Sequence, residues 1–336
     1  MHSDEALPEG KLPIRVLRKM LTDLSASSLV VGPSIGVDVG VSRTRGRFIV
    51  SSSDPITGTE HRLGWHAVNV SANDVATSGI MPDTINVVAM FPRSTNASQI
   101  KAFMSEINKS AKMLGITVAG GHTEITPGLS KPIAVITAFG SGDRFVTSAC
   151  AKANDVILMT KTAGIEGTAI LAQLKGVARL LQNERKVIDE GVQLLDRMSI
   201  LKEARTGFAT GLVHAMHDVT EGGVLGAVYE MSLASNLGFE VDASKIPLEE
   251  CTQRICKATQ TDPLTLLGSG SLLLSCHKRH AHLVSKAIAE SGIRCNEIGR
   301  FVALQSVRTL VRGNKRVGLK ETSIQDGLWS ALQRYP

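Results

Sequence analysis

Residues 64–79 read Gly-Trp-His-Ala-Val-Asn-Val-Ser-Ala-Asn-Asp-Val-Ala-Thr-Ser-Gly. Its length and residue types predict a helix over about 64–79. Small residues, mainly Ala, Ser and Val, occur on all sides of that helix. The absence of a broad charged face is typical of a helix that packs against protein on every side. We therefore expect this helix in the interior.

Polar side chains nevertheless share one face of this predicted helix. His66, Asn69, Asn73 and Thr77 recur at three- and four-residue spacing, and Asp74 lies at the edge of their face. A solvent-facing polar stripe is one interpretation, but Asn is a poor helix former and two in mid-helix need compensation. Amide and carboxylate oxygens suit a hard cation such as Mg²⁺, so a ligand-binding face is the other.

A glycine pair follows a predicted strand at 116–119, in the segment Gly120-Gly121-His122-Thr123-Glu124. Paired glycines can turn successive N–H groups toward an anion, and here a hydroxyl and a carboxylate follow them. We therefore predict an anion-binding turn, with an ordinary β-turn as the alternative.

A third motif, His217-Asp-Val-Thr-Glu-Gly-Gly223, lies between a predicted strand that ends at Met216 and a predicted helix over 222–236. Asp218 or Thr220 can cap that helix. Its free N–H groups and its macrodipole would attract a phosphate. The motif is compatible with a capped helix start, a phosphate site, or both.

Two acidic residues accompany the first predicted strands, Asp38 in the run 37–41 and Asp54 after the run 47–51. Ordinary surface turns are one interpretation of these acids. Together with Asp74, however, they could hold metal-bound phosphates, because Mg²⁺ is commonly held by carboxylates together with substrate phosphates.

Hydrophobic periodicity divides the chain into two α/β halves with a boundary near 140–150. The first half has the order strand-strand-helix-strand-helix-strand-strand, an α+β arrangement of ferredoxin-like type. It has a short helix at 12–24, strands at 84–91 and 132–139, and a helix at 97–114. The second half has strands at 155–160, 270–276 and 296–303, a long helical stretch at 166–207, and helices at 249–258 and 278–291.

Composition excludes several classes of protein. A chain of 336 residues, 43% hydrophobic and 20% charged, can bury a large core, which excludes a mainly disordered, collagen-like or coiled-coil protein. The net charge is 37 − 31 = +6, but no dense basic block is present. We therefore expect no nucleic-acid partner, while a mild positive bias suits an anionic small substrate.

The cysteines and the first residues of the chain indicate the cellular compartment. The five cysteines are odd in number and contain no CxxC pair, which is typical of free thiols in a reducing environment. The start MHSDEALPEG has no apolar core of a signal peptide, and the apolar runs are far shorter than a membrane span. We expect a cytoplasmic protein with no membrane segment.

The three motifs, in this order and spacing, resemble the aminoimidazole ribonucleotide synthetase superfamily, and most of all its HypE-type members. The resemblance covers about residues 10–332. It implies a two-domain PurM-like fold of the α/β class, with a ferredoxin-like N-terminal domain at 1–145 and a C-terminal α/β domain at 146–336. It also implies ATP and Mg²⁺ as cofactors and a homodimer whose N-terminal sheets pair.

The resemblance further implies roles for particular residues. The metal ligands would be Asp38, Asp54 and Asp74. The nucleotide would be held by Asn69, Asn73, Gly120, Gly121, Thr123, Asp218, Thr220, Gly222 and Gly223. On residue type alone, the candidates for proton transfer are His122, Glu124 and His217.

The implied chemistry is phosphorylation by ATP of an unreactive oxygen, which then leaves in a dehydration or cyclisation, or remains phosphorylated. HypE carries its substrate on a cysteine in a C-terminal Pro-Arg-x-Cys tail, whereas residues 332–336 here read Leu-Gln-Arg-Tyr-Pro. We therefore expect a separate substrate, either a small molecule or one borne by a protein. Two alternatives are a small-molecule kinase resembling thiamine-monophosphate kinase and a non-catalytic nucleotide-binding scaffold or maturation partner.

Overall fold

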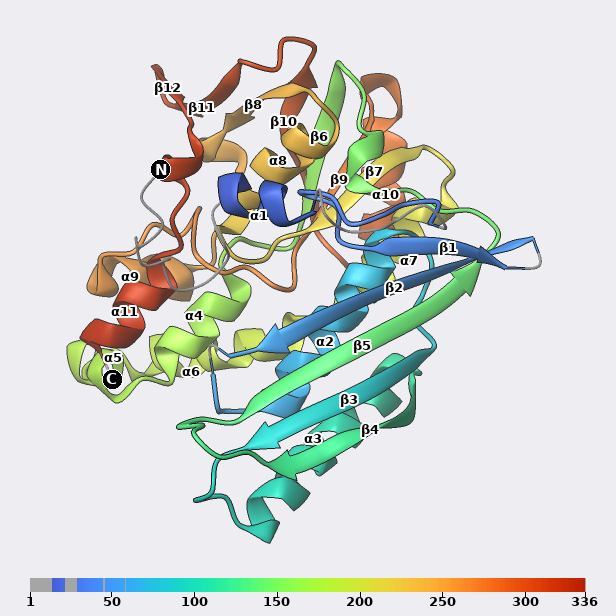
Figure 1. The fold of residues 1–336 in the computed structure, drawn as a ribbon. Coiled ribbons are helices and arrows are strands. Elements are labelled where there is room, and N and C mark those ends of the chain that lie inside the picture. The colour runs from blue at the N-terminus through green and yellow to red at the C-terminus, as the bar shows by residue number, and fades with distance from the viewer. Residues whose placement is uncertain (1–13, 22–28, 45, 58, 336) are drawn as a thin grey trace.

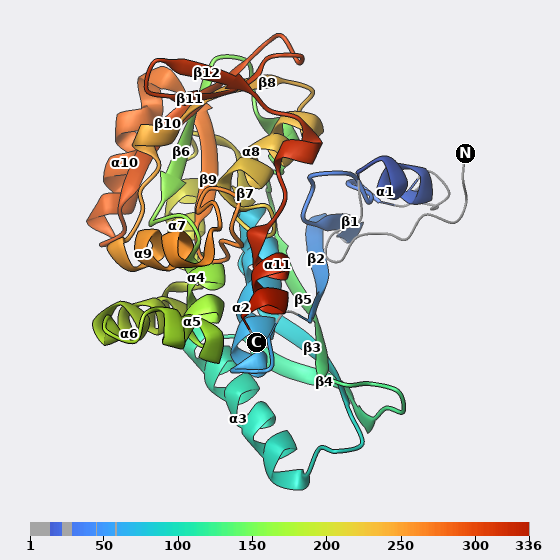
Figure 2. The ribbon, with the colours of Figure 1, turned by 90° about the vertical axis from the view of Figure 1, so that its left-hand side faces the viewer.

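The computed structural model describes residues 14–21, 29–44, 46–57 and 59–335. The first half forms a five-stranded sheet in the order β1-β2-β5-β3-β4, antiparallel except for the β3–β4 pair (Figure 1). Helices α2 and α3 lie on one face of this sheet (Figure 2). The elements are α1 (Ile14–Leu21), β1 (Gly40–Thr44), β2 (Arg47–Ile56), α2 (Leu63–Thr77), β3 (Thr84–Phe91), α3 (Ala97–Leu114), β4 (Thr117–Ile125) and β5 (Ile133–Gly142).

The second half forms a seven-stranded sheet in the order β12-β11-β8-β10-β6-β9-β7. Buried side chains on its two faces pack against α8 on one side and against α7 and α10 on the other. Its strands are β6 (Asp155–Thr160), β7 (Val213–Asp218), β8 (Gly238–Asp242), β9 (Leu272–His277), β10 (Cys295–Val302), β11 (Arg308–Arg312) and β12 (Lys315–Gly318). Its helices are α4 (Ile165–Ala172), α5 (Lys175–Leu180), α6 (Arg185–Gln193), α7 (Leu201–Ala209), α8 (Gly223–Ala234), α9 (Glu250–Thr259), α10 (Ala281–Glu290) and α11 (Gly327–Arg334).

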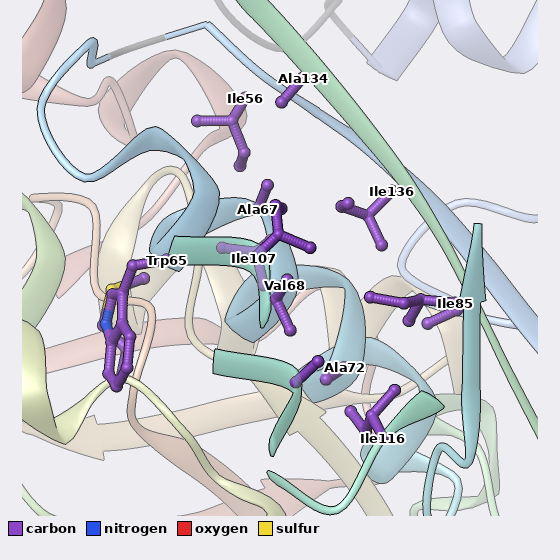
Figure 3. Close-up of a cluster of buried hydrophobic side chains, with 14 of the residues drawn as sticks. Ile56, Trp65, Ala67, Val68, Ala72, Ile85, Ile107, Ile116, Ala134 and Ile136 are labelled. Carbon is purple, nitrogen blue, oxygen red and sulfur yellow. The ribbon is translucent and has the colours of Figure 1, made fainter. Parts of the chain in front are cut away.

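Helix α2 lies between the two halves, and all of its residues are buried. It contacts β2, β5 and α3 of its own half as well as α7 and β7 of the other. Figure 3 shows its Ala67, Val68 and Ala72 beside Ile107 of α3 and Ile85 and Ile136 of the sheet. Small side chains allow this approach from every direction, as the sequence predicts.

The seven elements after α1 confirm the predicted order, but three local predictions are wrong. The predicted strand at 37–41 is displaced, because β1 spans Gly40–Thr44 and includes only Gly40 and Val41 of that run. Gly120 and Gly121 form no turn, because both lie inside the continuous strand β4. The stretch 166–207 is broken into α4, α5, α6, a 3₁₀ turn and α7. Helices α4, α5 and α6 pack with α9, whereas α7 contacts α2 and α10. Periodicity shows that such a stretch is helical, but the breaks depend on tertiary contacts.

Other differences lie in the second half. The predicted helix at 278–291 begins only at Ala281, after a 3₁₀ turn over Lys278–His280. Strands β8, β11 and β12 and helix α11 were not predicted. Helix α11 lies beside α4, far from it in sequence (Figure 2). The predicted helix at 12–24 is observed as α1, and its first and last residues lie outside the described residues. Among the described helices, none is long and apolar enough to span a membrane.

The glycine pair in β4 generates a stability prediction with an internal control. A Cβ on Gly121, whose φ is 153°, would lie 1.8 Å from the carbonyl oxygen of Val87 in β3. A Cβ on Gly120 would meet nothing closer than Asn86 Oδ1 at 3.8 Å. We expect Gly121→Ala to lower the free energy of unfolding by about 1–3 kcal/mol, because the β3–β4 pair must shift. Gly120→Ala should change it far less, and equal losses in denaturant unfolding would contradict this account.

Candidate functional site: a buried acid cluster between the two halves

Four carboxylates from four different segments meet beside α2. Asp38 precedes β1, Asp54 lies on β2, Asp74 lies on α2, and Asp218 ends β7. Ser52 Oγ lies 2.7 Å from Asp74 Oδ2 and 3.3 Å from Asp54 Oδ2. Burial raises the pKa of Asp74 well above its usual value, and the charges of Asp54, Asp218 and Asp38 raise it further. We call these four aspartates the acid cluster.

His217 lies beside two of these aspartates, Asp38 and Asp218, and is almost fully buried. Its Nδ1 is 3.4 Å from Asp38 Oδ2 and 3.7 Å from Asp218 Oδ1. Its Nε2 is 3.2 Å from Glu230 Oε2, which comes from α8. Burial alone would lower the pKa of His217, but Asp38, Asp218 and Glu230 together raise it well above its usual value. A higher pKa favours the protonated, cationic form of the ring among these acids.

The donor set of the acid cluster suits a divalent cation. Potential ligand atoms of Asp38, Asp218 and a neutral His217 all lie within 4.8 Å of one another, while a protonated His217 leaves the two carboxylates as ligands. Both carboxylate oxygens of Asp218 are buried, and neither has a hydrogen-bond partner among the described residues. A buried carboxylate left in this way is costly unless a cation completes it. Oxygen ligands favour Mg²⁺ or Ca²⁺ over soft metals.

The polar face of α2 contacts protein groups. Asn73 Nδ2 donates to Met198 O at 2.9 Å, and its Oδ1 accepts from the backbone N–H of Ile200 at 2.9 Å. Asn69 Nδ2 lies within hydrogen-bond distance of Trp65 O and Ser110 Oγ. The interpretation as a solvent-facing stripe is therefore wrong, because these side chains are buried. The two amides compensate their poor helix propensity by bonding within α2, to α3 and to the second half.

His66 provides another link between the halves that the sequence did not indicate. Its Nδ1 lies 2.6 Å from Oε1 of Glu166 in α4, and both side chains are buried. Thr77 bonds locally, since its Oγ1 donates to the carbonyl oxygen of Asp74 at 2.6 Å.

The segment from Gly120 to Glu124 lies apart from the acid cluster. It belongs to the exposed edge strand β4, which β3 and β5 separate from β2. His122 Nε2 lies 3.2 Å from Glu124 Oε2, and Thr126 Oγ1 donates to Glu124 Oε1 at 2.6 Å. These two contacts lower the pKa of Glu124. Within one chain, Thr123 and its neighbours are not brought to the same place as Asp54 and Asp74.

The loop after β7 differs from its predicted form. Gly222, with φ of 83°, holds the N-cap position of α8 and offers no side-chain cap. The prediction that Asp218 or Thr220 holds this position is therefore wrong. The N–H of Gly223 donates to Thr220 O, and that of Gly222 donates to Asp326 Oδ2 at 3.1 Å. The first N–H groups of α8 are thus used within the chain, while Asp218 turns toward the acid cluster.

Two residues of the site were missed by the sequence argument. Ser52 lies two positions before Asp54 on β2, so strand alternation could have placed it on the same face. Nothing in the sequence indicated that Glu230 belongs to the site, because its position opposite His217 depends on how α8 packs on β7.

This architecture, two α/β halves with an acid cluster at their junction, defines a two-domain PurM-like protein. The model of the N-terminal domain of AIR synthase related protein matches residues 36–141, and the model of the C-terminal domain matches residues 152–312. Together they cover most of the chain, which therefore belongs to the AIR synthase related family.

Several curated proteins are similar in sequence to this chain. The chain is 25% identical over 240 residues to a hydrogenase expression/formation protein of Methanocaldococcus jannaschii, covering 68% of this chain and 66%, just under two thirds, of the relative. It is 23% identical over 261 residues to carbamoyl dehydratase HypE of Escherichia coli, covering 76% and 75%. It is 25% identical over 252 residues to thiamine-monophosphate kinase of Pyrococcus horikoshii, covering 70% and 74%.

A solved structure shows the same fold. Hydrogenase maturation protein HypE in complex with ATP superposes with a TM-score of 0.69 over 94% of this chain and 96% of that one, at 17% identity.

The electrostatics of the acid cluster generate a pH-dependent prediction for the metal-free protein. A carboxyl whose pKa is raised on folding favours the folded state while protonated, and this stability is lost as pH rises through the folded pKa. Asp74→Asn keeps an acceptor for Ser52 but carries no charge. We expect its Tm in chelator to exceed that of the wild type at pH 8 by on the order of 2 °C. The gap should close toward pH 4, and equal Tm values at both pH values would contradict the raised pKa.

Proposed function

We propose that this protein is a cytoplasmic, ATP- and Mg²⁺-dependent enzyme that activates an oxygen of a separate substrate by phosphorylation. The observation that carries the proposal is the acid cluster, above all the unsatisfied buried carboxylate of Asp218. Asp38, Asp54, Asp74 and Asp218 would hold Mg²⁺, which supplies neutralisation of phosphate charge when bound. The similarity to HypE and to thiamine-monophosphate kinase supports the class of reaction.

The proposed roles of the chain's own groups differ from those expected on residue type. His217 has a carboxylate against each ring nitrogen, so it is a poor acceptor for a substrate proton. We assign it the role of a fixed cation that limits repulsion between Asp38 and Asp218. Such preorganised charge is typical of sites that stabilise transferring phosphoryl groups. Asn73 is assigned to holding the 198–200 segment against α2 and not to nucleotide contact.

A homodimer would give the exposed strand β4 a function. The open face and edge of the first sheet expose Val88, Val118 and Ile125. We propose that the N-terminal domains, taken as residues 1–145, pair through this sheet. His122 and Glu124 would then act in a site that the partner copy completes, which would account for their distance from Asp74.

A small-molecule kinase is the second candidate, supported by the kinase relative. The two reactions differ in where the γ-phosphate ends. A kinase leaves it on the product, whereas a dehydratase or cyclase releases inorganic phosphate as the activated oxygen departs. Following a γ-phosphate label in candidate substrates would separate them, and a non-catalytic scaffold would bind ATP without any release.

The nucleotide site can be tested by calorimetry. We expect the wild-type chain to bind ATP only with Mg²⁺ present, and Asp74→Asn to bind at least tenfold more weakly, because one cation ligand is lost. Asp196→Asn is the matched control, since Asp196 is exposed and paired with Arg62 at 3.1 Å. Absence of ATP binding by the wild type, or an unchanged dissociation constant in Asp74→Asn, would refute the proposal.

A further inference from the structure

A segment at the C-terminal end, residues 319–334, contacts the loop that carries Asp218. This segment lies beyond residue 312, where the match to the C-terminal domain model ends. The backbone N–H of Gly222 donates to Asp326 Oδ2 at 3.1 Å, and Trp329 Nε1 donates to Glu221 Oε1 at 3.1 Å. Two adjacent residues of the loop are thus held by two side chains from the start of α11.

The helix that supplies these contacts is firmly packed. Leu328 and Ala331 of α11 are buried in the same cluster as Ile170 and Leu171 of α4. Both figures of the whole fold show α11 alongside α4 (Figures 1 and 2). The contacts to Glu221 and Gly222 therefore start from a rigid support and not from a loosely attached tail.

The carboxylate of Asp326 joins α11 to the loop that follows β7. Its Oδ1 accepts from the N–H of Leu328 at 2.9 Å and caps α11, while Oδ2 holds Gly222. Burial raises the pKa of Asp326 to about 7, with Glu221 and Glu166 adding to the rise and the two N–H donors opposing it. A neutral Ser or Asn would cap α11 without that cost, so capping alone does not explain the carboxylate.

We propose that Asp326 and Trp329 are positioning residues for the acid cluster. By fixing Glu221 and Gly222, they hold the loop 218–223 so that the Asp218 carboxylate faces Asp38 and Asp74. The inference rests on the proposed function, since the ligand of the cluster is taken as Mg²⁺-bound ATP. If docking of α11 and ligand binding favour the same loop conformation, each strengthens the other by the same factor.

The chain offers a direct reporter, because Trp65 and Trp329 are its two tryptophans. In the full chain labelled with 5-fluorotryptophan, ¹⁹F NMR gives one signal for each. Trp65 is buried in α2 and bonded to Leu195 O at 3.0 Å, so it serves as the internal reference. We expect saturating Mg·ATP to move the Trp329 signal and to leave the Trp65 signal nearly in place.

Two variants test whether the contacts from α11 to the loop 218–223 affect Mg·ATP binding. Asp326→Asn has one acceptor oxygen for two N–H groups, and Trp329→Phe keeps an aromatic ring but loses the donor to Glu221. We expect each to weaken Mg·ATP binding about tenfold, or about 1.4 kcal/mol, in calorimetry on samples shown to be folded. Asp242→Asn is the matched control, because Asp242 caps a different turn of the same half and should leave affinity unchanged.

The outcomes separate this inference from the proposed function. If the wild type binds Mg·ATP but both variants bind it equally well and the Trp329 signal does not move, the positioning role is wrong and the nucleotide site stands. If the wild type does not bind Mg·ATP, the proposed function and the positioning role fall together. Weaker binding in Asp242→Asn as well would show a general loss of stability and would also overturn the assignment.

Discussion

The complete burial of α2 is the constraint on which the rest of the structure depends. This helix forms the inner layer of the first half and also contacts β7 and α7 of the second. It therefore has no solvent face, and its small residues let sheets and helices approach it from all sides. Its polar side chains are therefore removed from solvent, and Asn73 and His66 bond to groups across the junction of the halves.

The same burial gives Asp74 its chemistry. A carboxyl at the end of a solvent-exposed helix would ionise freely, whereas here three other aspartates and the loss of water oppose its charge. The four aspartates repel one another, and the protonated form of His217, favoured by its raised pKa, offsets part of this repulsion. Neighbouring groups whose pKa values are strongly shifted are characteristic of functional sites. Such sites often lower the stability of the fold because their arrangement serves binding.

Strand and helix order followed from periodicity, whereas the grouping of Asp38, Asp54 and Asp74 was expected only from their residue type and from the family resemblance. These acids come from separate elements, and only the packing of β2 and of the segment before β1 near α2 brings them close. The Gly120–Gly121 pair shows the limit of this reasoning. Glycine allows a turn, but it equally allows a strand to pass close to a neighbouring carbonyl, as at Val87. Only the pairing of β3 with β4 distinguishes the two.

By itself, the sequence determined the buried helix, the two α/β halves and the family, because these depend on local periodicity and on motifs of adjacent residues. Tertiary structure alone decided which polar groups bind one another. Asn73 bonds to Ile200 and Asp326 bonds to Gly222, in both cases across more than a hundred residues, and Glu230 of α8 lies against His217 of β7. Such pairs depend on how whole elements pack, and no spacing along the chain encodes them.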